Sequence, residues 1–324
     1  MYKERTAMKK HIILAAIVAL LIPTLSFAAF YADTDGDGYT DQVYACGSPV
    51  QVCIYHPRTG VTTMYRNGAA SSFSINSVVD TDGVAGAEVV VVWTSTYGNP
   101  KGIDVIRDRN RTTTTYDYTN NPSFSINSVV DTDGNVGGEI VVLWTYAGGP
   151  NHGLDVIHDA QRTKYTYDYS TASSFSINSV VDTDNTAGGE IIVIYTTTWG
   201  ERGIHAIHDR TRTRNVYLYT YKGTFEIASV SDTDGIGGME IIVKYPTGTY
   251  STGATKGIDV IHDINRTTNI YDFTSQYFFS IQAIRNYDGI SGNEICSYWE
   301  RYPSYGYKLI TDRTRSFQDR ANCN

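Results

Sequence analysis

The sequence predicts an all-β fold, a six-bladed β-propeller of four-stranded blades. Beyond residue 28 only four leucines remain, whereas Val, Ile, Thr and Tyr abound, and these residues suit a half-buried pleated strand. The phrase Phe-Ser-Ile-Asn-Ser-Val-Val-Asp recurs at 73–80, 124–131 and 175–182, with degraded copies at 225–232 and 279–286. A truncated first copy carries Asp33. Repeats of four short strands are the composition of propeller blades.

The second repeat shows the four expected strands in order. The repeated phrase is strand one, a buried apolar run at 88–93 is strand two, 102–106 is strand three, and the Thr- and Tyr-rich run 111–118 is strand four. Turn residues separate these runs at the spacing of about 8–12 residues that is typical of all-β folds.

Six such repeats account for nearly all of the chain after residue 28. A solenoid would also stack units of this kind, but its end repeats would be atypical. Here the end repeats resemble the middle ones, so we expect the blades to close into a ring. The expected single domain is 29–324, with blades at about 30–68, 73–119, 124–170, 175–221, 225–274 and 279–321.

Residues 1–28 have the pattern of a secretory signal peptide. Lys9 and Lys10 precede an apolar run at 12–22, and small residues stand before the expected cleavage site after Ala28. A membrane anchor is the alternative, but the run is short for a membrane span. We therefore predict a secreted protein, extracellular or periplasmic, without a membrane span. The net charge of −8 argues against nucleic acid as a partner, because phosphates are bound by an excess of Lys and Arg.

Export changes how the four cysteines are interpreted. Oxidising surroundings favour disulfides over a metal site, and four cysteines allow three pairings. We prefer Cys46–Cys53, which closes a short hairpin, and Cys296–Cys323, which fixes the C-terminal tail. A pairing between the two ends of the chain is the alternative.

The loop between the first two strands of the first repeat predicts a calcium site. Residues 33–41 have the form Asp-x-Asp-x-Asp-Gly-x-x-Asp. Alternate carboxylates on a tight, glycine-containing loop supply the hard oxygen ligands that Ca²⁺ requires. The expected ligands are the side chains of Asp33, Asp35, Asp37 and Asp41 and the backbone carbonyl of Tyr39.

This motif, in a strand–loop–strand setting repeated around a propeller, resembles the FG-GAP/VCBS repeats of integrin α-subunits and of secreted bacterial proteins. The resemblance covers all six repeats in layout, but only the first repeat in the full motif. It implies a calcium-stabilised extracellular binding module that is not an enzyme.

The other loops depart from the full motif at the third carboxylate, and their last ligand position is Glu. They are either weaker calcium loops or metal-free turns in which Asp side chains accept loop N–H groups. An oxygen remains at the fifth position in two of them, as Asn135 and Thr186. The candidate ligands are Asp80, Asp82 and Glu88; Asp131, Asp133, Asn135 and Glu139; Asp182, Asp184, Thr186 and Glu190; and Asp232, Asp234 and Glu240.

Other polar residues repeat as well, and their repetition argues against catalysis. The pattern Asp108-x-x-Arg111 recurs in five repeats and predicts a turn closed by Asp. His158 and its copies occupy one repeat position, equivalent to Arg107, so we assign them a surface or packing role. No nucleophile–base constellation appears, and we therefore predict that the protein is not an enzyme. A polysaccharide lyase or hydrolase is the alternative.

The segments that join strands two and three vary in length and sequence from repeat to repeat, whereas the strands on either side of them are similar. Each carries an aromatic residue, and variable loops on a rigid scaffold usually carry function. We predict that these aromatics stack on sugar rings or anchor an extracellular protein, whereas a purely structural propeller is the alternative. The expected ligand-binding residues are Tyr97, Tyr146, Trp199, Tyr250 and Tyr302.

Overall fold

The computed structural model of the chain describes residues 29–47, 51–68, 70–95, 101–121, 123–145, 152–247 and 256–324. Within these ranges, 24 strands form six four-stranded antiparallel sheets. The prediction of an all-β, six-bladed propeller with four-stranded blades is confirmed. The predicted signal peptide lies outside the described residues. No helix in the described part of the chain is long and apolar enough to cross a membrane.

The first three sheets follow the order of their strands along the chain. Sheet one contains β1 (Phe30–Ala32), β2 (Asp41–Cys46), β3 (Gln51–His56) and β4 (Val61–Tyr65). Sheet two contains β5 (Ser72–Val79), β6 (Glu88–Thr94), β7 (Lys101–Arg107) and β8 (Thr112–Asp117). Sheet three contains β9 (Ser123–Val130), β10 (Glu139–Thr145), β11 (His152–His158) and β12 (Thr163–Asp168).

The last three sheets repeat this order. Sheet four contains β13 (Ala172–Val181), β14 (Glu190–Thr197), β15 (Arg202–His208) and β16 (Thr213–Leu218). Sheet five contains β17 (Thr224–Ser231), β18 (Glu240–Thr247), β19 (Gly257–His262) and β20 (Thr267–Asp272). Sheet six contains β21 (Phe278–Arg285), β22 (Glu294–Arg301), β23 (Ser304–Thr311) and β24 (Ser316–Arg320). Short 3₁₀ turns follow strand three at Asp108–Asn110, Asp209–Thr211, Asp263–Asn265 and Asp312–Thr314.

A glycine stands near the start of strand three, at a position where a ring from strand two lies over the backbone. In sheet two, a Cβ atom on Gly102 would lie 2.5 Å from the carbonyl oxygen of Tyr116 and 3.0 Å from the Trp93 ring. Any side chain would displace one of them. Sheets three to six have the same arrangement, with Gly153 under Trp144, Gly203 under Tyr195, Gly257 under Tyr245 and Gly306 under Trp299.

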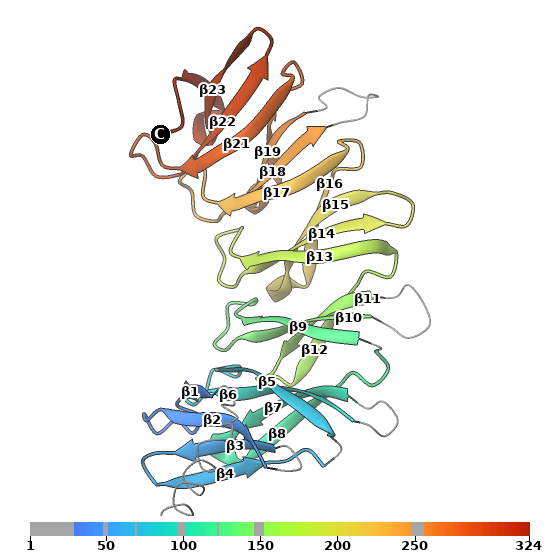
Figure 1. Cartoon of the computed structure of the whole chain (residues 1–324), viewed down its shortest axis with the longest axis vertical. Helices are drawn as coiled ribbons and strands as arrows, with labels where there is room; N and C mark the ends of the chain where they lie inside the picture. Colours follow the sequence, from blue (N-terminus) through green and yellow to red (C-terminus); the bar gives the residue numbers. More distant parts are fainter. Residues whose placement is uncertain are drawn as a thin grey trace, which may run out of the picture.

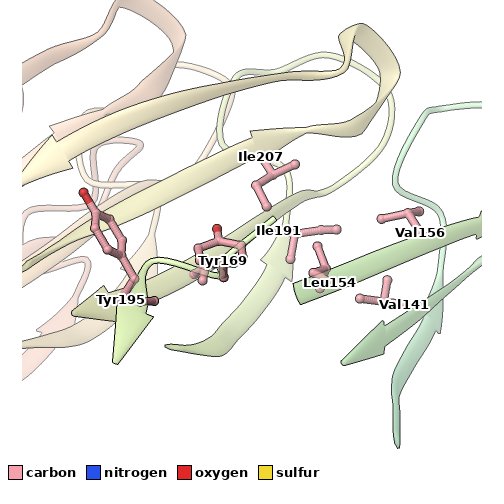
Figure 2. Packing of buried hydrophobic residues seen from close by; sticks show 9 residues of the cluster. Val141, Leu154, Val156, Tyr169, Ile191, Tyr195 and Ile207 are labelled. Carbon is pink, nitrogen blue, oxygen red and sulfur yellow. The ribbon is translucent and has the colours of Figure 1, made fainter. Parts of the chain in front are cut away.

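Neighbouring sheets pack face to face through aliphatic side chains of their central strands. Figure 2 shows Val141, Leu154 and Val156 of sheet three beside Ile191 and Ile207 of sheet four. All five are buried, and burial of apolar area is the main stabilising contribution to folding. Because an inner sheet is covered on both faces, its second strand is a continuous apolar run instead of an alternating one.

The six sheets follow one another in a curved row, with sheet one and sheet six at opposite ends (Figure 1). Among the described residues, no hydrogen bond or ion pair joins 30–66 to 278–323. The ring closure that we expected from the similarity of the end repeats is therefore not observed between these two sheets.

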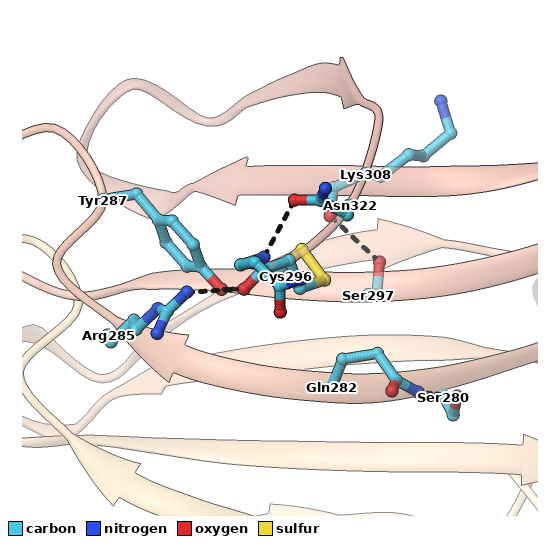
Figure 3. The surroundings of a disulfide bond; sticks show 10 residues. Ser280, Gln282, Arg285, Tyr287, Cys296, Ser297, Lys308 and Asn322 are labelled. Carbon is cyan, nitrogen blue, oxygen red and sulfur yellow. Dashed lines mark hydrogen bonds between the residues drawn. A yellow bond between two sulfur atoms is a disulfide. The ribbon is translucent and has the colours of Figure 1, made fainter.

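Both preferred disulfides are confirmed, Cys46–Cys53 and Cys296–Cys323. They belong to the two end sheets. The second disulfide holds the C-terminal tail against sheet six, where Arg285 and the Tyr287 hydroxyl donate to the carbonyl of Cys323 at 2.6 and 2.8 Å (Figure 3). The tail thereby covers part of the last sheet.

Candidate functional site

The first loop folds around the carboxylate of Asp33. That carboxylate accepts the backbone N–H groups of Gly36 at 2.8 Å, Asp37 at 3.2 Å and Gly38 at 2.8 Å. Asp37 in turn accepts the N–H of Tyr39 at 2.9 Å. The alternation of Asp with Gly allows this turn because Gly36 and Gly38 have positive φ angles of 77° and 85°.

Asp33, Asp35 and Asp37 form one group of carboxylates, and Asp41 meets Asp35 in a second group with His56 and Asp108, whose ligand atoms also lie within 4.8 Å of one another. One carboxylate oxygen from each of Asp33, Asp35 and Asp37 lies within 4.8 Å of the others, which fits the donor set that Ca²⁺ prefers. Asp41 is buried and accepts the N–H and hydroxyl of Thr34 at 2.9 and 2.7 Å. Its other oxygen lies 3.0 Å from His56 Nδ1.

In the later loops, the first Asp closes a turn through its carboxylate. Asp80 accepts the N–H groups of Asp82 at 3.1 Å and Gly83 at 2.6 Å. The same bonds to the residue three positions on occur at 2.7, 2.7 and 2.6 Å in the next three loops, on Asp131, Asp182 and Asp232. These are the hydrogen bonds of Asx turns.

The Glu at the end of each later loop points into the protein interior. Glu88 is buried and accepts the N–H of Thr81 at 2.8 Å, and burial raises the pKa of Glu88 to about 7. Three more loops share this bond at 2.7, 2.6 and 2.6 Å, from Thr132 to Glu139, Thr183 to Glu190 and Thr233 to Glu240.

The loops also stack directly on one another from sheet to sheet. The N–H of Ala87 donates to the carbonyl of Asp33 at 2.7 Å, and that of Gly138 donates to Asp80 at 2.9 Å. A Cβ atom on Gly83 would lie 2.6 Å from the carbonyl of Val136. The loops are therefore a continuous column along one side of the row.

Below this column, each pair of sheets is joined by one buried carboxylate, and we call this arrangement the inter-sheet junction. Between sheets two and three, Asp159 accepts the Tyr116 hydroxyl at 2.8 Å and lies 2.9 Å from the Thr81 hydroxyl. It also contacts the Arg107 guanidinium. The other four junctions use Asp108 with Tyr65, Asp209 with Tyr167, Asp263 with Tyr217, and Asp312 with Tyr271.

The sequence predicted the turn but missed this role of its Asp. Arg111 N–H donates to the backbone carbonyl of Asp108 at 3.1 Å, so the main chain closes the turn. The Asp108 carboxylate is left to meet Tyr65 of the preceding sheet. A signal was available, because Tyr65 and its copies recur in register with Asp108 and its copies.

A histidine completes most junctions, and it is buried instead of lying on the surface. Nδ1 of His208 lies 3.2 Å from Asp184 and 3.5 Å from Glu190, while Nε2 lies 3.0 Å from Asp263 of the next sheet. Burial acts to lower the pKa of His208, but hydrogen bonds to Asp263 and Glu190 outweigh it and raise that pKa to about 10. His56, His158 and His262 take the same place in sheets one, three and five.

The junction between sheets two and three tests whether these clusters are metal sites. The donor set Asp184, Glu190 and His208 lies within 4.8 Å, which a metal ion would also suit. Arg107 holds the equivalent place to His208, with Nε 2.9 Å from Asp82. A guanidinium has no lone pair for a metal and is always charged. The junction therefore works with a protein cation, which a protonated histidine also supplies.

The residues for a sixth junction, between sheet six and sheet one, are all replaced. Sheet one has Pro57 where sheet two has Asp108, and sheet six has Tyr287 in place of the loop threonine. Thr311 stands in the histidine position and Arg320 in that of the tyrosine. A junction of the kind that joins the other sheets is therefore not available between sheets six and one.

A second contact joins the sheets nearer the opposite side. The Tyr118 hydroxyl donates to Asp155 of the next sheet at 2.9 Å. In sheet four a histidine takes this place, and the Tyr169 hydroxyl lies 2.9 Å from His205 Nδ1. Burial, with a smaller contribution from the charge of Arg214, lowers the pKa of His205 to about 4. The repeated Tyr118 position was expected only to pack the outer strand, so this contact was not predicted from the sequence.

The turns between strands two and three lie at the end of each sheet opposite the loop column. Trp199 is 69% exposed there. Two hydrogen bonds fix its turn. The N–H of Thr197 donates to the carbonyl of Glu201 at 2.7 Å, and the N–H of Glu201 donates to the Thr197 hydroxyl at 2.9 Å. Tyr302, on the last such turn, is 97% exposed. Three other predicted ligand-binding residues, Tyr97, Tyr146 and Tyr250, lie outside the described residues.

Comparison with known proteins gives no family. No family model matches the chain, and no curated protein matches it. Among solved structures, an ACO/RPE65 chimera aligns with a TM-score of 0.34 and 11% identity, over 90% of this chain and 70% of that one. A mutant Synechocystis apocarotenoid oxygenase aligns with a TM-score of 0.33 and 10% identity, over 88% of this chain and 67% of that one. The WD40 domain of SCAP from fission yeast aligns with a TM-score of 0.34 and 9% identity, over 89% of this chain and 64% of that one.

These comparisons correct one prediction. From the sequence we predicted that the protein is not an enzyme, yet oxygenases stand among its structural neighbours. That prediction is wrong. The repetition of polar residues from sheet to sheet does not exclude catalysis in a fold of this kind. The alignments assign no activity to this chain, and the proposal below makes no such exclusion.

Proposed function

We propose that the protein is a secreted binding module whose residues 29–324 form one domain and present the turns between strands two and three to a polymeric glycan. Trp199 carries the proposal. Its ring is 69% exposed, although its turn is fixed by backbone and side-chain hydrogen bonds. A large flat ring held in solvent is suited to stack on a sugar ring, and a fixed turn loses little entropy on binding.

The arrangement of sheets supports binding to a polymer over a monosaccharide. Five junctions hold the sheets in fixed order, so aromatic turns such as those of Trp199 and Tyr302 recur along one side of the row. Several weak contacts on one rigid scaffold gain strength on a repetitive ligand through effective concentration.

Calcium and the FG-GAP/VCBS type of repeat belong to the same proposal. The carboxylates of Asp33, Asp35 and Asp37 converge within 4.8 Å, and their oxygens would hold Ca²⁺ at the start of the loop column. The bound ion would offset the repulsion between these carboxylates and so fix the first sheet.

The test compares wild type with Trp199→Ala on polymeric glycans and on the corresponding monosaccharides. We expect wild type to bind the polymers, and the variant to lose at least about tenfold in affinity, as for an aromatic hot spot. Tyr31→Ala is the matched control, because Tyr31 is 68% exposed but lies in the edge strand of sheet one. Undiminished binding by a folded Trp199 variant, or no glycan binding at all, would favour an extracellular protein partner or a purely structural role.

A further inference from the structure

Sheet six has an open cleft lined by tyrosines on the face that no other sheet covers. Its volume is about 420 Å³, and its lining includes Tyr277, Tyr298, Glu300, Tyr302, Ser304 and Tyr305. The rings of Tyr298 and Tyr305 lie 6.5 Å apart at 46°, so they are inclined toward a common space instead of being stacked.

The strand register explains why these side chains meet. Glu300 of β22 pairs with Tyr305 of β23, and Tyr298 stands two residues before Glu300 on the same face. In sheets three and four, the position of Tyr298 is held by Leu143 and Ile194, which pack in the cores between sheets. Sheet six ends the row, and aromatic rings replace the aliphatic side chains on its outer face.

The charge in this cleft is a carboxylate. Glu300 Oε1 accepts the Tyr298 hydroxyl at 2.8 Å, and among the described residues Glu300 has no basic partner at ion-pair distance. Among the described residues that line the cleft, none is basic. Lys256 Nζ donates to the carbonyls of Gln276 and Tyr277 at 3.2 and 3.1 Å, so its charge lies beside the cleft. Lys308 Nζ lies 5.9 Å from the centre of the Trp299 ring, and the Arg320 guanidinium lies 5.9 Å from that of the Tyr287 ring. Arg301, which follows Glu300 in the chain, is exposed.

We propose that this tyrosine cleft binds a quaternary ammonium group. Such a cation is weakly hydrated, so it can leave water for the electron-rich faces of aromatic rings, and a nearby carboxylate adds Coulomb attraction. An anionic ligand would meet Glu300 without a compensating cation in the described lining. This site goes beyond the proposed function, because its ligand is different and only Tyr302 is shared with the glycan surface.

The first experiment titrates the protein with choline and with its neutral isostere 3,3-dimethylbutan-1-ol, followed by calorimetry or by NMR of the ligand. We expect choline to bind about tenfold more tightly than the isostere, within the range of cation–π energies at partly desolvated sites. Equal binding of the two compounds would overturn the proposal, because the cleft would then select apolar volume. Absence of choline binding would overturn it as well.

Substitutions then place the site. Glu300→Gln and Tyr302→Ala should each weaken choline binding about fivefold or more, with folding checked by circular dichroism. Tyr221→Ala is the matched control, since Tyr221 is 74% exposed in the turn between β16 and β17. Undiminished binding in both cleft variants would overturn the assignment. Trp199→Ala should reduce glycan binding and leave choline binding unchanged, so the two proposals fail separately.

Phosphatidylcholine vesicles distinguish the source of the cation. Retention of the protein on vesicles, lost in Glu300→Gln, would assign the group to a lipid headgroup. Choline binding without retention on vesicles would assign it to a soluble ammonium compound. Both results support the cleft, whereas vesicle retention that Glu300→Gln leaves intact would count against it.

Discussion

At the scale of single residues, Asp263 shows how one carboxylate joins two sheets. It accepts the Asn215 amide at 2.8 Å and the Tyr217 hydroxyl, and it lies 3.0 Å from His208 Nε2. Burial acts to raise the pKa of Asp263, but hydrogen bonds from these partners hold that pKa below its usual range. All three partners come from the preceding sheet.

Asp263→Ala should therefore destabilise the protein strongly. It leaves His208 buried with its positive charge only partly compensated, a situation that costs about 3–5 kcal/mol. The measurement is the free energy of unfolding in urea. Asp319→Ala is the control, because Asp319 is exposed and its pair with Lys308 is long, at 3.4 Å. A loss no larger than that of the control would show that the junction is not a stabilising contact.

His205 predicts how stability changes in acid. Its pKa in the folded state is lowered to about 4 by burial and by Arg214, against about 6.5 in an unfolded chain. The unfolded state therefore binds the proton first, and the contribution of His205 is present above pH 6.5 and lost as the pH falls from 6.5 toward 4.

The variant His205→Asp provides the test, because the other sheets have Asp104, Asp155 and Asp259 at this position. In this variant the decline in stability between pH 6.5 and 4, on the order of 2–3 kcal/mol from this group, should be smaller. Thermal melts across this pH range measure it. Identical pH profiles for wild type and variant would contradict the assigned pKa.

The residue scale also shows where prediction from sequence ends. The spacing of Asp108 and Arg111 predicts a local turn, and the turn is present. The local spacing does not show that the carboxylate crosses to Tyr65, 43 positions earlier in the chain, and only the shared repeat register of the two residues indicates it. Local motifs specify bonds within a few residues, whereas the partner of a buried charge depends on which sheets become neighbours.

At the scale of elements, the repeated phrase specifies more than a strand. Strand one pairs with strand two through a bulge, with the register shift between Ile75 and Ser77, so Asn76 is the extra residue. The same shift occurs in the other complete repeats, at Asn127, Asn178, Ala228 and Gln282. Periodicity predicted the strands, but the bulge follows from pairing, which the sequence does not show directly.

The first loop gives a prediction at this scale. If Ca²⁺ binds Asp33, Asp35 and Asp37 only in the folded state, calcium at a hundred times its Kd should add about 2.7 kcal/mol to stability. Excess chelator should remove this increase, and Asp37→Ala should abolish most of it. Differential scanning calorimetry with and without calcium measures both.

Ile236→Ala is the matched control for the calcium measurement, since Ile236 holds the position of Asp37 in the fifth loop and is exposed. It should leave the calcium response unchanged. Melting temperatures that chelator and Asp37→Ala both leave unaltered would show that the loop is held by its Asx-type hydrogen bonds alone.

At the scale of the whole molecule, identical junctions make each sheet depend on its immediate neighbours. Each apolar core and each junction carboxylate connects two sheets that are consecutive in the chain. Among the described cores and junctions, none connects sheets that are further apart. Stability should then be approximately a sum of sheet and interface contributions. The repeats in the sequence predicted that the sheets pack against one another in the same way. The missing junction between sheets six and one depends on four single-residue replacements, which in the sequence look like ordinary divergence between repeats.

We expect those replacements at the ends to prevent copies of the chain from joining end to end. A fragment of residues 70–274 would expose Asp108 on sheet two and the intact partners Thr233, His262 and Tyr271 on sheet five. These surfaces are complementary and lie on opposite ends, so copies would join head to tail without closing, as fibres do. Light scattering should show concentration-dependent filaments for the fragment, reduced by Asp108→Ala and absent for the full chain. In the full chain we expect Pro57, Thr311 and Arg320 to prevent this head-to-tail joining, because none of them can form the junction contacts that Asp, His and Tyr form between the other sheets.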